Sequence, residues 1–176
     1  IHGVQDICNM LLRRGKPFLI EAGHWKRSDL FERAGAALSA ARMASKMRNS
    51  RTGLVGTPFE GMGDFAVPFE EMKRHIGMAV VPFDFKKTKR ILDSISRHEV
   101  EAEMAQDKKR FASGKFTEDE HRAASTASLA VRKWLDENKL SSFSMNFMDC
   151  AGKGRFPTVP FLEASKAMSR GIGYAC

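Results

Sequence analysis

The sequence contains little cysteine and no long hydrophobic run. Only three of its 176 residues are cysteines, and Cys8, Cys150 and Cys176 are far apart and show no CxxC spacing. This pattern argues against a disulfide framework and against a zinc knuckle, and it fits a reducing cytoplasm. A membrane-spanning helix needs about 18 consecutive apolar residues. No such stretch is present, and the first residues do not resemble a signal peptide. We expect a soluble cytoplasmic chain, internal to a longer protein, with no membrane partner.

The glycine fingerprint of dinucleotide-binding domains is also missing. GxGxxG should follow the first predicted strand, but residues 21–25 read Glu-Ala-Gly-His-Trp. The later Gly61-Met62-Gly63 and Gly152-Lys153-Gly154 are short signals that ordinary turns explain. A nicotinamide or flavin cofactor is therefore not expected.

Basic residues outnumber acidic ones, with 29 Lys and Arg against 21 Asp and Glu and a net charge of +8. Clustered Lys and Arg can bind the phosphates of nucleic acids. Here the clusters lie beside acidic residues, in segments 84–93 and 99–110, as on solvated helices. Since no nucleic-acid motif is present, no nucleic-acid partner is expected, and a basic-surface binding domain is kept only as a rival hypothesis.

The order of apolar segments predicts an α/β fold. Apolar residues recur at helical spacing over 4–12, 30–44, 91–104, 117–135 and 160–168, and a further short helix is expected to begin near Pro68. Short apolar or alternating runs predict strands at 18–20, 52–56, 78–83 and 143–147. Strands separated by helices pair in parallel, because a parallel crossover needs a dozen or more residues. We expect one domain over residues 1–176, with a doubly wound, mainly parallel sheet and helices on both faces, as in flavodoxin-like and Rossmann-like folds.

Ligands of such sheets bind beyond the carboxyl ends of the strands. Four positions follow a predicted strand: Gly23-His24-Trp25, the loop 57–64, Phe83-Asp84 and the stretch 147–154. His24 could contact a ligand, or it could be a structural histidine bonded to loop backbone. The loop 57–64 could bind a polyol or simply turn the chain.

Other reactive side chains have structural interpretations. Cys8 lies on the apolar face of the first predicted helix, where a buried and inert thiol is expected. His75, His98 and His121 lie in charged helical sequence, so we expect them on the solvated surface.

Several motifs recur in a familiar order. They are His2-Gly3, Gly23-His24-Trp25, Arg51 to Gly56 with Gly61-Met62, Ser142 to Phe147, and Gly171 to Cys176. In order and spacing these motifs resemble the L-arabinose and L-fucose isomerase family, over essentially the full chain, and they are closer to the arabinose isomerase branch.

The resemblance implies the middle domain of an aldose to ketose isomerase, most similar to an enzyme that converts L-arabinose to L-ribulose. It implies a divalent metal, usually Mn²⁺, held by two glutamates and two histidines that all lie beyond Cys176. The isolated segment is then expected to be inactive, with no catalytic residue and no metal ligand of its own. A homo-oligomer, trimer or hexamer, with pockets between subunits is also implied.

The resemblance also assigns substrate-binding residues. The family's substrate-contact histidine falls on His2, its pocket methionine on Met62 and its pocket phenylalanine on Phe147. His24 is a further candidate. The alternative is a non-catalytic sugar-binding or assembly domain of the same fold, or an L-fucose-type isomerase.

Overall fold

The computed structural model describes residues 2–61, 66–112, 114–152 and 155–175. The chain divides into two compact units, Ile1–Ser45 and Lys46–Cys176. Met62, one of the predicted pocket residues, lies outside the described residues.

The first unit contains the two helices predicted there. Helix α1 spans His2–Arg13 and is followed by Gly15, whose φ of +60° is the left-handed conformation of a helix C-cap. Helix α2, Leu30–Arg48, begins in this unit. Neither helix has a buried residue. Cys8 is only half-buried, so the prediction of a buried thiol is wrong, because no core forms over the apolar face of α1.

The strand predicted at 18–20 is also wrong. These residues are in no ladder, and Leu19 and Ile20 are 78% and 61% exposed. A strand forms only where its backbone N–H and C=O groups bond to a neighbour. The ladders of the described chain all lie in the second unit, and Pro17 has no N–H to donate.

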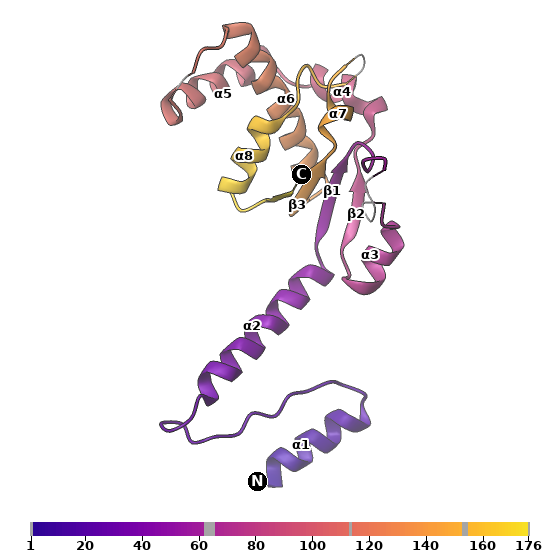
Figure 1. Ribbon diagram of the computed structural model, residues 1–176, viewed down its shortest axis with the longest axis vertical. Coiled ribbons are helices and arrows are strands. Elements are labelled where there is room, and N and C mark those ends of the chain that lie inside the picture. The colour runs from indigo at the N-terminus through magenta and orange to yellow at the C-terminus, as the bar shows by residue number, and fades with distance from the viewer. Residues whose placement is uncertain (1, 62–65, 113, 153–154, 176) are drawn as a thin grey trace. The chain divides into compact units, whose positions relative to one another are not determined.

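The second unit contains a parallel sheet of four strands in the order β2-β1-β3-β4. Figure 1 labels β1, β2 and β3 of this sheet. The strands are β1 (Arg51–Val55), β2 (Ala79–Pro82), β3 (Ser142–Met145) and β4 (Gly173–Ala175). In the middle of β1, Gly53 pairs with Val81 of β2 on one side and with Phe143 of β3 on the other. The α/β class and the parallel pairing are confirmed. The predicted extent of the domain, 1–176, stays a prediction, since the described strands all lie after residue 50.

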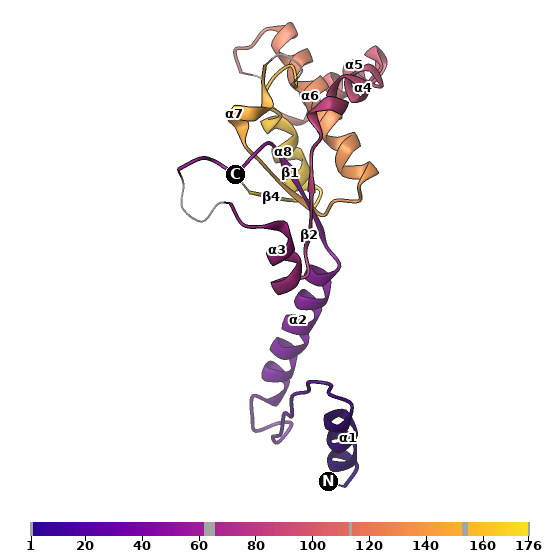
Figure 2. The same ribbon diagram turned by 90° about the vertical axis from the view of Figure 1, so that its right-hand side faces the viewer.

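Helices connect successive strands, as a parallel sheet requires (Figure 2). Helix α3, Phe69–His75, joins β1 to β2. Between β2 and β3 lie a 3-10 turn η2 (Phe85–Lys87) and helices α4 (Thr88–Asp93), α5 (Arg97–Arg110) and α6 (Glu118–Glu137). Helices α7 (Phe147–Cys150) and α8 (Phe161–Ser169) lie between β3 and β4.

Some elements differ from the prediction. The helix expected through 91–104 is two helices, because Ser96 caps a new one at its N-terminus. The strand expected over 143–147 ends at Met145, and Phe147 begins α7 because the side chain of Asn146 caps that helix. Strand β4 was not predicted.

Aromatic side chains fill the core between the sheet and its helices. The ring of Phe83 lies 5.2 Å from that of Trp134 and 5.0 Å from that of Phe156, measured between centroids. Phe143 and Trp134 are 2% and 5% exposed. This packing holds the carboxyl ends of the strands in place. None of the helices in the described ranges is long and apolar enough to span a membrane.

Candidate functional site

A pocket of about 240 Å³ lies at the carboxyl ends of β1, β3 and β4. Its lining includes Leu54, Thr57, Phe59, Ser144, Asn146 and Ala175. Two hydroxyls and an amide thus lie beside an aromatic ring and aliphatic groups. A sugar presents the same mixture, since its hydroxyls form hydrogen bonds and its C–H groups pack on apolar surface.

The loop after β1 is tied to the start of α7. Oδ2 of Asp149 accepts hydrogen bonds from the backbone N–H and the hydroxyl of Thr57, both at 2.7 Å. Nδ2 of Asn146 donates to the carbonyl of Thr57 at 3.0 Å, and Oδ1 of Asn146 accepts from the N–H of Met148. These bonds join segments about 90 residues apart in sequence and give the pocket a defined wall.

Gly56 permits this close approach. Its φ is +91°, and a Cβ at this position would lie 2.8 Å from Cβ of Asp149. Any larger residue would therefore strain the backbone and push α7 away.

The two bonds from Thr57 also stabilise the ionised form of Asp149. The backbone N–H of Thr57 has the largest effect and its hydroxyl the next, and together they lower the pKa of Asp149 below its usual value. The carboxylate is therefore charged at neutral pH and remains an acceptor. Its role here is to hold the loop.

Phe147 lies beside this pocket. Its ring centroid is 5.5 Å from that of Phe59, a lining residue, and 6.2 Å from that of Phe161. Phe147 remains 42% exposed, so its ring can still contact another molecule.

The other predicted site residues lie elsewhere in the chain. His2 is the first residue of α1 and is exposed, and His24 is exposed in a turn. Nδ1 of His24 accepts a hydrogen bond from the N–H of Lys26 at 3.1 Å, as the structural alternative for this residue expected. His2 and His24 belong to the first unit and Phe147 to the second, so a pocket shared by them stays a prediction.

Sequence reasoning did not single out Thr57, Asn146 or Asp149. Thr57 and Asp149 nevertheless fall in the segments 57–64 and 147–154, which were predicted to face ligands. Asn146 carried a signal of its own, because Asn directly before a helix is a favoured N-cap. Their mutual bonds depend on parallel pairing of β1 with β3, which brings the two loops to the same edge.

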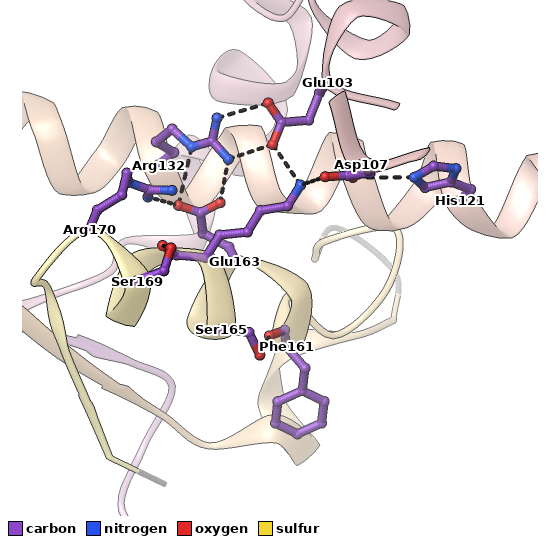
Figure 3. A network of polar contacts seen from close by, with 10 residues as sticks. Glu103, Asp107, His121, Arg132, Phe161, Glu163, Ser165, Ser169 and Arg170 are labelled. Atoms are coloured by element: carbon purple, nitrogen blue, oxygen red, sulfur yellow. Dashed lines mark hydrogen bonds and ion pairs between the residues drawn. The ribbon is translucent and has the colours of Figure 1, made fainter. Parts of the chain in front are cut away.

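A second polar cluster, which shares no residue with the pocket lining, joins α5, α6 and α8 (Figure 3). Arg132 donates to Glu103 and Glu163, and Arg170 also binds Glu163. Lys166 bridges Glu103 and Asp107, and Nε2 of His121 lies 3.2 Å from Oδ2 of Asp107. We call these seven residues the interhelical ion cluster. His121 is only 7% exposed, so its predicted surface position is wrong, whereas His75 and His98 are exposed as predicted.

The interhelical ion cluster shifts the pKa of Glu103. Burial raises the pKa of Glu103, but hydrogen bonds from Arg132 and Lys166 outweigh burial and lower it to about 2. Every carboxylate of the cluster has a cationic partner, as buried charges require.

Within the described ranges, no three His, Cys, Asp or Glu side chains gather where they could hold a metal ion. No protein-family model matches the chain, and no curated protein sequence matches it.

Proposed function

We propose that this chain is the middle α/β domain of an aldose to ketose isomerase that acts on an L-sugar, most similar to the conversion of L-arabinose to L-ribulose. Its role is to supply part of the substrate pocket. The observation that supports this most directly is the contact of Phe147 with Phe59 beside a mixed polar and apolar pocket at the carboxyl edge of the sheet. Phe147 is the residue to which the family resemblance assigns a substrate contact.

The chemistry of the reaction suggests which steps this chain supports and which steps the rest of the protein supports. Moving hydrogen between C1 and C2 of an open-chain sugar needs a Lewis acid on the neighbouring oxygens and a group that transfers the proton. The described residues do not fit a metal site. In this proposal Mn²⁺ is bound by residues after Cys176, in a cytoplasmic homo-oligomer. This chain binds and orients the sugar through hydroxyl and amide groups and the Phe147 ring.

The proposal predicts the effect of removing the Phe147 ring. In the full-length protein with Mn²⁺, Phe147→Ala should lower kcat/KM for L-arabinose by about ten- to a hundredfold, since pocket contacts contribute at this scale. Ketose formation followed by ¹³C NMR of labelled sugar measures the change.

Phe69→Ala is the matched control, because Phe69 is similarly exposed, at 41% against 42%, but lies on α3. Its kcat/KM should equal that of the wild type. No turnover of any L-pentose or 6-deoxy-L-hexose by the Mn²⁺-loaded full-length protein would refute the isomerase. If sugar still bound and Phe147→Ala weakened that binding, the non-catalytic sugar-binding domain would replace it.

A further inference from the structure

A row of three side chains on neighbouring strands lines the pocket at the carboxyl ends of β1, β3 and β4. In the parallel register Leu54 of β1 pairs with Ser144 of β3, and Ser144 pairs with Ala175 of β4. All three residues belong to the lining of the pocket. Because neighbouring strands lie about 5 Å apart, the row places one hydroxyl between two aliphatic groups.

This row lies on the face of the sheet opposite to the aromatic core. Successive side chains along a strand point to opposite faces. Phe143, which precedes Ser144, is 2% exposed, and its ring centroid lies 4.9 Å from that of Tyr174, which precedes Ala175. Ser144 itself is only half-buried. A molecule in the pocket can therefore reach the Ser144 side chain.

Ser144 also has hydrogen-bonding capacity that the protein does not use. The polar side chains of the lining are Thr57, Ser144 and Asn146. Thr57 donates its hydroxyl hydrogen to Asp149, and both polar atoms of the Asn146 side chain bond to backbone groups. In the part of the chain that the structure describes, no residue bonds to the hydroxyl of Ser144. This hydroxyl is thus available to donate to an occupant and to accept from it.

We infer that Ser144 is a specificity-determining contact, which bonds a sugar hydroxyl at C3, C4 or C5 while Leu54 and Ala175 pack on the C–H groups beside it. The inference rests on the proposed function, in which the metal acts on the oxygens at C1 and C2. The remaining hydroxyls are then left to protein side chains. A site that bonds a hydroxyl discriminates against an analogue that lacks it, because the polar group of the site loses its partner.

The test compares the wild type and Ser144→Ala, as full-length proteins with Mn²⁺, on L-arabinose and on the analogues that lack the hydroxyl at C3, at C4 or at C5. Ser144→Ala should lower kcat/KM for L-arabinose about three- to tenfold, the scale of one neutral hydrogen bond. The change should be mainly in KM, since the bond is made in both the ground state and the transition state. On the analogue that lacks the bonded hydroxyl, the two proteins should be equal. An equal loss on all four sugars would overturn the inference, because Ser144 would then act only on the shape of the pocket.

Ser142→Ala is the matched control. Ser142 lies two residues earlier on the same face of β3, but its hydroxyl donates to Thr52 at 2.8 Å and it is not part of the lining. Its kcat/KM should equal that of the wild type on every sugar. Turnover by the wild type with no change in Ser144→Ala would overturn this inference and leave the proposed function intact.

Binding of L-arabinitol, measured by calorimetry, tests the contact without turnover. If the wild type converts no sugar but binds L-arabinitol, the isomerase fails, and Ser144→Ala should still raise Kd about three- to tenfold. An unchanged Kd would overturn the inference, and absence of both turnover and binding would overturn it together with the proposed function.

Discussion

At the scale of single residues, Gly53 in the centre of β1 is a tightly constrained position in the core. A Cβ there would lie 2.4 Å from Cη2 of Trp134 and 2.9 Å from Cδ1 of Leu140. Both neighbours are 5% exposed or less, so neither has room to move. We predict that Gly53→Ala lowers the free energy of unfolding by about 2 kcal/mol, as overpacking of a filled core does. Urea denaturation followed by circular dichroism measures the loss.

Gly114→Ala is the control for this prediction, because a Cβ at Gly114 meets nothing within 4 Å. Its stability should match that of the wild type. If Gly53→Ala were as stable as the wild type, Trp134 would not pack as closely over β1 as described.

At the scale of elements, the break between α4 and α5 depends on a capping box. The hydroxyl of Ser96 accepts from the N–H of Glu99 at 3.2 Å, and the Glu99 carboxylate accepts from the N–H of Ser96 at 2.7 Å. We predict that Ser96→Ala destabilises the protein by about 1 kcal/mol, the usual cost of losing an N-cap acceptor. Hydrogen exchange should show faster opening of the first turn of α5.

Ser96→Asp retains an acceptor and should stay close to the wild type. If Ser96→Ala exchanged no faster than Ser96→Asp, α4 and α5 would be one continuous helix as the apolar spacing alone predicted. An equivalent capping box formed by Thr117 and Glu120, whose Thr-x-x-Glu pattern is visible in the sequence, begins α6.

At the scale of the α/β unit, the interhelical ion cluster makes stability depend on pH. The pKa of Glu103 is about 2 in the folded chain and is 4.5 for an unperturbed glutamate. Because the folded value is lower, ionised Glu103 stabilises the fold above about pH 4.5, and this contribution is lost as pH falls toward 2. We predict that Glu103→Gln costs about 3 kcal/mol at pH 7, since it leaves Arg132 and Lys166 short of a partner.

Urea denaturation at pH 7 and at pH 3 tests both the cost of the substitution and its dependence on pH. The difference between the wild type and Glu103→Gln should shrink at pH 3, because Glu103 is then protonated in the unfolded chain but still ionised in the folded chain, so part of its contribution to stability is lost. Glu70→Gln, on exposed α3, is the control and should leave stability unchanged at both values. A difference independent of pH would show that Glu103 acts through packing rather than charge.

Local patterns were sufficient for much of this fold. The strands β1, β2 and β3, helix α1, the capping box of α6 and the parallel pairing could all be predicted, because periodicity, caps and crossover length are properties of adjacent residues. The same reasoning pointed to the sheet edge where the candidate pocket lies.

Only the tertiary structure decided which of these segments are buried. The sequence around His121 is charged and predicted a solvated surface, but its partner Asp107 and the other cluster residues come from three helices that pack together. The run 18–20 looked like a buried strand, yet it has no partner strand in the described chain. Burial and pairing depend on residues distant in sequence, so local periodicity determines the elements and packing determines their environment.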